Sequence, residues 1–374
     1  GLKTMQPAVV DLLRLLTHQA LNMAVPARAA VDTTVKLARE TVGQRITGLI
    51  NAVGRRITAH ALREWVELLS AGLDENGRLA VATHHPHWIV AAYEKVLPEN
   101  ELAPALEANN LASKPTLVVR PGLAQVDELA PAVPTMYSPF GAVLDGVPAD
   151  LTAVREGRAG VQDEGSQLVC LALDRVNTPD GPWLDLCAGP GGKSALLAGL
   201  ARRRGEHLVA NEVAVHRAEL VEKALAVYPP GTVNVICSDG RDSEPVRARR
   251  PFSRIMVDAP CSGLGALRRR PEARWRRTPD DVAELVLLQR TLLETAIGLL
   301  VPGGVVAYVT CSPHADETTG VVEAVMTDFP DLKLLDAASL LPEVPNATRR
   351  GCVQLWPHRH GTDAMFLALL RCMS

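Results

Sequence analysis

The 374 residues are enough for two or three ordinary domains, and a hydrophobic content of 47% is typical of a globular protein with a substantial core. The net charge of −3 excludes a protein that is strongly basic throughout, although arginines cluster between 268 and 277. An odd cysteine count, no C-x-x-C pair and no long apolar span or signal peptide indicate a reduced, cytoplasmic protein without a membrane segment.

The first third of the chain has a helical pattern. Apolar residues recur at three- and four-residue steps up to about Asn110, with prolines and glycines between the runs, which predicts an all-α domain over 1–112. The chain begins with glycine rather than methionine, and its first helix has no obvious cap, so we expect this domain to be N-terminally incomplete. The histidines at 84, 85 and 87 have no partners at ligand spacing, so we expect a loop and helix start and no metal.

A short segment connects this domain to the rest. A strand is predicted over 116–119, and the stretch after it is rich in proline and glycine, so we expect a small α/β linker module over 113–178. The residues 163–167 open a helix over 168–176 that leads into the third segment.

From residue 179 to the end, strands and helices alternate, which predicts parallel strands joined by right-handed crossovers in a Rossmann-like α/β domain. Five strands are expected at 183–187, 207–212, 233–238, 254–258 and 305–309, and two closing strands near 332–335 and 364–370 complete a seven-stranded mixed sheet. Helices are expected over 193–203, 215–227, 280–300 and 317–327. Thr278 caps the third of these, with Pro279 at its first position, and 302–304 closes it.

The stretch WLDLCAGPGGKS at 183–194 joins an apolar strand, a glycine turn and a helix start. Glycines let the backbone turn sharply and approach a ligand closely, and the helix presents unpaired N–H groups. This arrangement is typical of the nucleotide-cofactor corner of an open α/β sheet. The turn is G-P-G-G rather than the full G-x-G-x-x-G, which disfavours a nicotinamide dehydrogenase.

Acidic residues follow the next two strands. Glu212 ends the second strand, and Asp239 follows the third. Because the carboxyl ends of parallel strands meet at one edge of the sheet, a nucleoside along that edge would contact the glycine turn, then Glu212, then Asp239.

Two of the seven cysteines stand in glycine-, proline- and serine-rich loops. Cys261 follows the fourth strand and Cys311 follows the fifth. In a doubly wound sheet these strands are neighbours, so we expect both thiols side by side on the cofactor edge. A thiolate that adds to C6 of cytosine makes C5 reactive toward an electrophilic methyl group, and a base must then remove the C5 proton. The cysteines at 170, 187, 237 and 352 are expected to be buried packing residues.

With these motifs the chain resembles the RNA cytosine-5 methyltransferases that use S-adenosylmethionine. The segment 258–263, DAPCSG, resembles their proline-cysteine motif, and 310–312, TCS, resembles their threonine-cysteine motif. The segment 160–166 resembles the one that precedes their catalytic domain. A further match is to their cofactor loop, which is resembled here by Cys187, Ala188, Gly189, Pro190, Gly191, Gly192 and Lys193.

This resemblance implies a role for each matching residue. Cys311 is the expected nucleophile, and Cys261 is expected to assist product release. Asp258 is the expected active-site acid near the methyl donor and the base, with Lys193 beside the same pocket. The ribose-binding acid and the adenine-side acid are implied to be Glu212 and Asp239.

The N-terminal helices resemble the NusB-like domain of the bacterial ribosomal small-subunit branch of this family, through 26–31 and 48–56. The resemblance implies an enzyme that methylates C5 of a cytosine in RNA, most simply 16S ribosomal RNA, as a cytoplasmic monomer without a metal. The basic run at 268–277 directly follows the proline-cysteine loop, so we expect it to contact RNA phosphates.

Two alternatives stay open at this point. A DNA cytosine-5 methyltransferase has a similar site but uses the proline-cysteine thiol as its nucleophile. A NusB-like RNA-binding assembly factor could carry an α/β domain that binds a nucleotide without catalysis. Substitution of Cys311 and of Cys261 distinguishes an RNA methyltransferase from the first alternative. Transfer of labelled methyl groups to RNA distinguishes it from the second.

Overall fold

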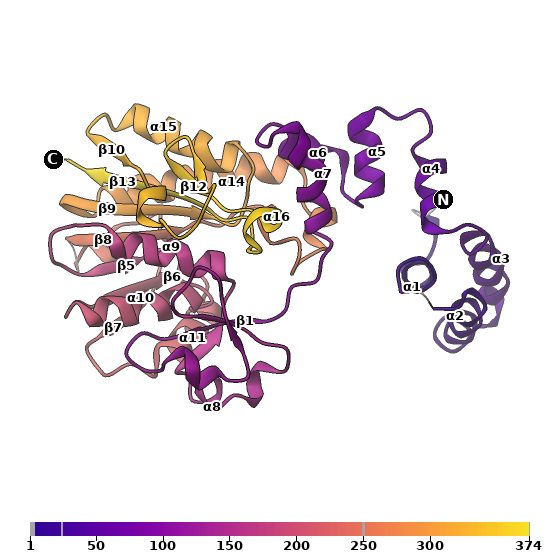
Figure 1. The fold of residues 1–374 in the computed structure, drawn as a ribbon, viewed down its shortest axis with the longest axis horizontal. Coiled ribbons are helices and arrows are strands. Elements are labelled where there is room, and N and C mark those ends of the chain that lie inside the picture. Colours follow the sequence, from indigo (N-terminus) through magenta and orange to yellow (C-terminus); the bar gives the residue numbers. More distant parts are fainter. Residues whose placement is uncertain (1–3, 24, 249–250, 374) are drawn as a thin grey trace. The chain divides into compact units, whose positions relative to one another are not determined.

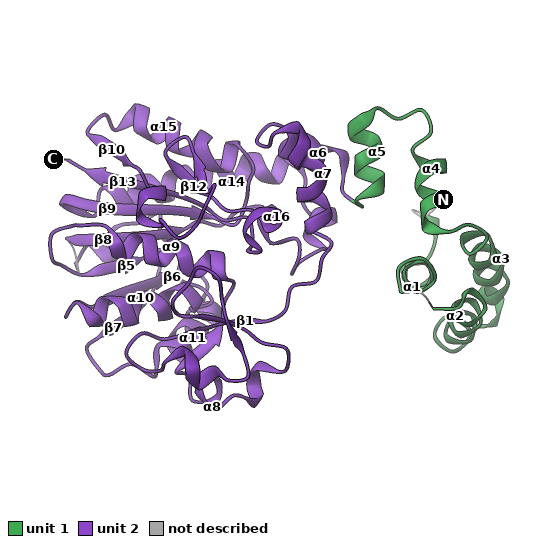
Figure 2. Cartoon of the chain, viewed as in Figure 1, with its two compact units in different colours: residues 1–84 green, residues 85–374 purple. Residues whose placement is uncertain are grey.

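The computed structural model describes residues 4–23, 25–248 and 251–373, so the chain start at Gly1 lies outside the described residues. The chain forms two compact units, residues 1–84 and 85–374 (Figure 2). The predicted boundaries near 112 and 178 fall inside the second unit, where they mark changes from helices to a small sheet and then to a large one.

The first unit is helical. Its helices are α1 Pro7–Leu21, α2 Ala27–Thr41, α3 Thr47–Ile57, α4 Leu62–Leu69 and α5 Glu75–Ala82, with the 3-10 turn η2 Gln44–Ile46 before α3. The first three pack together around Val9, Leu16, Val31 and Ile50, which are almost fully buried. These side chains recur on one face of each helix, as the periodicity predicted.

The second unit begins with two more helices, α6 His87–Glu94 and α7 Glu99–Ala108. His84 and His85 lie in the turn before α6, and His87 is its first residue, which confirms the predicted loop and helix start. Within the described part of the chain, no group of three or more His, Cys, Asp or Glu side chains could hold a metal ion. Within the same part, no helix is long and apolar enough to cross a membrane.

A small antiparallel sheet follows, with strand order β2-β3-β1-β4. Its strands are β1 Thr116–Val119, β2 Val133–Pro134, β3 Gly141–Val143 and β4 Ala159–Val161. The short helix α8 Thr152–Arg155 and the 3-10 turns η3 Val126–Leu129 and η4 Pro148–Asp150 complete the module, which has its own core around Leu117 and Leu129. The sheet agrees with the predicted small α/β module.

A nine-stranded sheet forms the centre of the second unit, with order β11-β12-β13-β9-β8-β5-β6-β7 and β10 paired to β13. All seven predicted strands are present: β5 Trp183–Asp185, β6 Leu208–Glu212, β7 Val233–Cys237, β8 Phe252–Asp258, β9 Leu300–Thr310, β10 Leu332–Leu335 and β13 Phe366–Cys372. The prediction of seven was two too few. The added hairpin of β11 Thr348–Arg349 and β12 Cys352–Gln354 is too short to give a periodic pattern.

Helices cover both faces of this sheet (Figure 1). They are α9 Glu164–Arg175, α10 Gly192–Arg203, α11 Val215–Leu225, α12 Glu244–Arg247, α13 Ala273–Arg276, α14 Pro279–Ile297, α15 Val321–Asp328 and α16 Pro357–His360, with turns η5 Leu264–Ala266, η6 Asp316–Gly320 and η7 Ala338–Leu340. Alternate residues of β9 enter opposite cores: Val305 packs with α9 and α10, and Val306 packs with α14 and α15.

Two helix boundaries differ from the prediction. The helix capped by Thr278 ends at Ile297, and Pro302–Gly304 lies inside β9 instead of closing the helix. The helix predicted at 317–327 begins with the π-helical turn η6 at Asp316–Gly320. The central topology agrees with the prediction: β5 pairs in parallel with β8, and β8 pairs in parallel with β9.

Candidate active site

The glycine turn between β5 and α10 accepts no larger side chain at two positions. Gly191 has φ of 104°, and a Cβ there would lie 2.8 Å from Ala224. A Cβ on Gly189 would lie 2.2 Å from Glu212 Oε2. The Gly189 N–H instead donates to this oxygen at 2.9 Å, so the turn is held against the end of β6.

The two acids predicted along the sheet edge lie where the topology put them. Glu212 is the last residue of β6 and is almost fully buried; it also accepts the N–H of Ala214 at 3.1 Å and pairs with Arg217 at 3.6 Å. Asp239 follows β7 and is held by Arg241, whose hydrogen bonds lower the pKa of this carboxyl. Each carboxylate is fixed before any ligand binds.

One cavity of about 1010 Å³ connects these residues with both cysteines of the motifs. It is lined, among others, by Cys187, Gly189, Pro190, Lys193, Glu212, Asp239, Asp258, Cys261 and Cys311. Three residues of the predicted cofactor loop, Ala188, Gly191 and Gly192, do not line it. The Ala188 N–H bonds to Asn211 O at 2.8 Å, and the two glycines form the turn and start of α10.

Lys193 and Asp258 form an ion pair at 2.7 Å on the wall of this cavity. Burial lowers the pKa of Lys193, but the Asp258 carboxylate outweighs burial and leaves that pKa above its ordinary value. Lys193 is therefore a permanent cation beside the cysteines, although it is largely buried.

The two motif cysteines are neighbours, as the topology predicted, with their Sγ atoms 3.3 Å apart. A hydrogen bond from Cys261 lowers the pKa of Cys311, and Lys193 also favours the Cys311 thiolate. The pKa of Cys261 is raised by the same hydrogen bond, by burial and by the Glu317 and Asp258 carboxylates. Of the two sulfurs, Cys311 is therefore the one that ionises first.

Sequence reasoning did not find Glu317, which connects the two cysteine loops. Its side chain is fully buried, and its oxygens accept the Ser262 N–H at 2.7 Å and the Ser312 hydroxyl at 2.7 Å. Gln289 of α14 donates to the same carboxylate at 3.0 Å. Ser262 follows Cys261 and Ser312 follows Cys311, so this carboxylate links the two loops that carry the thiols. Its one sequence signal is an acid six residues after Cys311.

The other cysteines divide into two groups. Cys170 and Cys352 are buried, as predicted. The prediction was wrong for Cys237, which is exposed at the end of β7, an edge strand of the sheet, and for Cys187, which is half-buried on the cavity wall. Burial raises the pKa of Cys187 well above its ordinary value, so that thiol stays protonated.

The arginine run at 268–277 is not one uniform basic face. Arg274 is buried and donates to Asn110 at 2.7 Å, and Arg268 and Arg269 pair with aspartates. Three further arginines line the same cavity as the cysteines: Arg270, Arg276 and Arg277. The basic surface beside the site is therefore smaller than the sequence suggests.

The glycine corner, the acid that ends β6 and the helices on both sheet faces define a Rossmann-like protein of the methyltransferase class. A family model described as 16S rRNA methyltransferase RsmB/F matches residues 170–371, and a NusB family model matches residues 1–59. The chain belongs to the RsmB/F family of rRNA methyltransferases and carries a NusB domain at its N-terminus.

Similar proteins cover nearly the whole chain. "Putative methyltransferase Rv1407" of Mycobacterium tuberculosis is 47% identical over 99% of this chain and 82% of its own length. "Ribosomal RNA small subunit methyltransferase B" of Vibrio cholerae is 32% identical over 94% of this chain and 79% of its own length. The crystal structure of PH0851 has the same fold, with a TM-score of 0.82 at 24% identity over 99% of this chain and 83% of that one.

Proposed function

We propose that the protein transfers a methyl group from S-adenosylmethionine to C5 of a cytosine in 16S ribosomal RNA through a covalent bond between Cys311 and C6. The observation that carries this proposal is the pair of sulfurs 3.3 Å apart on one cavity wall, with Cys311 the more acidic. A single thiol would suffice for addition to C6, so a second thiol at contact distance supports a role in a later step.

The residues along the sheet edge suit S-adenosylmethionine, which supplies an electrophilic methyl group. Glu212 is aligned by two backbone N–H groups, and its carboxylate is suited to ribose hydroxyls. Asp239 follows the next strand, where its carboxylate is suited to a contact with the adenine part of the cofactor. Gly189 has no Cβ, so its backbone can lie against the Glu212 carboxylate.

The cysteines divide the reaction on the base between them. The Cys311 thiolate forms a bond to C6, which moves electron density to C5 and allows C5 to accept the methyl group. As this bond forms, the Cys261 thiol gives its proton to ring nitrogen N3, and the resulting thiolate removes the C5 proton after methyl transfer. The C6–sulfur bond then breaks, its electron pair returns Cys311 to the thiolate, and the N3 proton is released to solvent. Lys193 and Asp258 line the same cavity and are fixed by their ion pair for contacts to the base.

The target cytosine must leave any base stack before Cys311 can reach C6, because the ring face is covered in a helix. The arginines that line the cavity, Arg270, Arg276 and Arg277, suit the phosphates on either side of an unstacked nucleotide. The NusB domain is proposed as a second RNA contact.

The test is bisulfite mapping of 16S rRNA after incubation with the purified protein and S-adenosylmethionine, which reports base and position together. Cys311→Ala is expected to abolish transfer, and Cys261→Ala to accumulate a protein–RNA adduct that survives denaturing gel electrophoresis. A Cys311→Ala variant with normal turnover would refute the nucleophile. An adduct in Cys311→Ala but not in Cys261→Ala would instead support the DNA-type mechanism, and no transfer by the wild type would support the assembly factor.

A further inference from the structure

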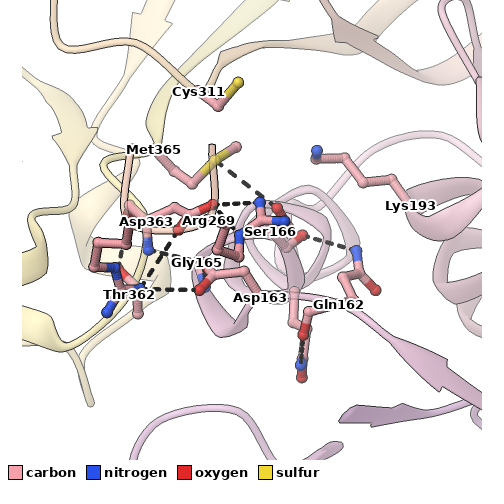
Figure 3. A network of polar contacts seen from close by, with 12 residues as sticks. Gln162, Asp163, Gly165, Ser166, Lys193, Arg269, Cys311, Thr362, Asp363 and Met365 are labelled. Carbon is pink, nitrogen blue, oxygen red and sulfur yellow. Dashed lines mark hydrogen bonds and ion pairs between the residues drawn. The ribbon is translucent and has the colours of Figure 1, made fainter. Parts of the chain in front are cut away.

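Two buried aspartates, Asp163 and Asp363, pair with Arg268 and Arg269. Figure 3 shows Asp163, Asp363 and Arg269 of this cluster below Cys311. Arg269 donates to Asp363 Oδ2 through Nε at 2.9 Å and Nη2 at 2.5 Å. Arg268 lies 3.3 Å from Asp163 and 3.5 Å from Asp363, and the Asp363 N–H donates to Asp163 Oδ1 at 3.0 Å. The cluster joins the start of α9, the loop after Cys261 and the segment before β13.

The cluster is held close to the nucleophile by backbone hydrogen bonds. The Gly265 N–H donates to Cys311 O at 2.8 Å, and the Ala364 N–H donates to Gly265 O at 2.9 Å. A Cβ at Gly265 would lie 2.1 Å from Ala364 O and 2.8 Å from Cys311 O, so this packing requires glycine. The residue next to Ala364 is Asp363, so the anchor of Arg269 is fixed relative to Cys311.

Arg269 differs from the other arginines of the run. Its side chain is 45% exposed, while its partner Asp363 is 0% exposed, so the guanidinium has one edge fixed on the protein and another directed to open space. Arg269 and Ser166 line the same cavity as Cys311. In Figure 3, Arg269, Ser166 and Met365 lie on the side of the network that faces Cys311 and Lys193.

The charges of this cluster argue against a role for Arg269 as a phosphate contact. The cluster contains two carboxylates and two guanidinium groups, so it adds no net positive field to attract RNA. Arg270, the next residue, is exposed and has no side-chain hydrogen bond or ion pair to any residue in the described ranges. A fixed, neutralised cation is suited to directional hydrogen bonding, whereas a free cation is suited to phosphate attraction.

The proposed reaction creates a need for such a donor. When the Cys311 thiolate adds to C6, negative charge moves into the pyrimidine ring and onto its carbonyl oxygen O2. Donors that are held in place before the reaction stabilise charge that develops in the transition state. We propose that Arg269 is a further catalytic residue that donates a hydrogen bond to O2 of the target cytosine, and that Asp363 is the positioning residue that holds it. This inference rests on the proposed function.

The experiment measures rate and affinity separately. Single-turnover methyl transfer is followed with RNA in saturating excess, and the RNA Kd is measured over a salt series. Arg269→Ala is expected to lower the saturated rate by roughly 10²–10³-fold, as for loss of one oxyanion donor, with an RNA Kd within about threefold of wild type. Arg270→Ala is expected to weaken RNA binding and to reduce the salt slope by about one. Arg350→Ala, which removes an exposed ion pair with Glu323, is the unaffected control.

Further variants keep the test valid if Arg269→Ala folds poorly because it leaves Asp363 buried without its main partner. Arg269→Lys keeps the charge but loses the two-pronged contact, so its saturated rate is expected to fall about tenfold. The double variant R269Q/D363N replaces the ion pair with a neutral pair and is expected to fold, bind RNA and react slowly. RNA that carries 5-fluorocytidine at the target traps the covalent complex, and both variants are expected to form it more slowly.

The outcomes distinguish this inference from the proposed function. If wild-type protein leaves 16S rRNA cytosines unmodified, the proposed function itself fails. If wild type methylates C5 but Arg269→Ala and R269Q/D363N keep the wild-type rate at saturation, only the role of Arg269 is overturned. If Arg269→Ala loses affinity and salt dependence as Arg270→Ala does, with an unchanged saturated rate, Arg269 is a phosphate contact and the inference is again overturned.

Discussion

Replacement of Glu317 tests whether one buried carboxylate sets the spacing of the two reactive sulfurs. Its oxygens accept the Ser262 N–H and a Gln289 amide hydrogen on one side, and the Ser262 and Ser312 hydroxyls on the other. In Glu317→Ala the two hydroxyls, 3.2 Å apart, can still bond to each other. The Ser262 N–H and the Gln289 hydrogen lose their acceptor in a fully buried place.

The expected loss of stability follows from those two donors. Each buried donor without a partner destabilises by about 1–3 kcal/mol, so the loss of two partners in Glu317→Ala should lower the free energy of unfolding by about 2–6 kcal/mol. For a unit of this size this lowers Tm by roughly 3–10 °C. Glu317→Gln keeps an acceptor for the N–H, and its amide group can donate to the hydroxyls, so it should lose only about 1–2 kcal/mol.

Activity should follow the same order, because both serines are adjacent to the reactive cysteines in the chain. A displacement of about 1 Å at a reacting group lowers the rate by about 10²-fold, so Glu317→Ala should lose at least that much methyl transfer, and Glu317→Gln less. Differential scanning calorimetry and single-turnover transfer measure the two effects. The matched control is Glu323→Ala, since Glu323 forms an exposed pair with Arg350 and should shift Tm by less than about 2 °C. A Glu317→Ala protein with wild-type Tm and rate would refute the reasoning.

Three further predictions follow from the same contacts. In Gly189→Ala the new Cβ would lie 2.2 Å from the carboxylate that ends β6, so S-adenosylmethionine binding measured by calorimetry should weaken by at least tenfold. Gly192→Ala is the control, because a Cβ there has nothing within 4 Å and should leave binding unchanged. Because the partner thiol's hydrogen bond and the Lys193 cation both lower the pKa of Cys311, Lys193→Met should move the pH–rate profile of adduct formation to higher pH. Burial raises the pKa of Asp185 to about 7, so the folded protein keeps a proton that the unfolded chain releases near pH ~4. Wild-type Tm should therefore fall as pH rises from about 4 to 7 and then level off. Asp185→Asn should reduce this slope and leave the part due to Asp163, whose pKa burial raises to about 6.

The parts of the fold that could be predicted are those set by local pattern and by the rules of parallel sheets. Strand and helix alternation gave all seven main strands, and the crossover rule placed Cys261 beside Cys311 although fifty residues separate them. The same rule placed Glu212 and Asp239 on one edge. These residues follow strands directly, so knowing the strand order was enough to place them.

Other features depend on contacts between segments that no local pattern connects. Glu317 reaches both cysteine loops from a π-helical turn, and the helix pattern at this position gives no sign that its side chain turns inward. Asp363 meets Arg269 across 94 residues, and only the pairing of β13 with β9 brings that segment to the site. The hairpin of β11 and β12 was missed because strands of two and three residues have no detectable period.

The roles of the two sulfurs show most clearly why position alone is insufficient. Cys261 and Cys311 are chemically identical side chains at contact distance, each after a parallel strand, and topology treats them alike. The hydrogen bond between the two sulfurs lowers the pKa of Cys311 and raises that of Cys261. Asp258 opposes ionisation of both sulfurs, Glu317 opposes it at Cys261, and Lys193 favours it at Cys311. The order of ionisation therefore comes from neighbours on other strands and loops. Lys193→Met removes a cation that favours the Cys311 thiolate and should therefore narrow the difference in pKa between the two sulfurs.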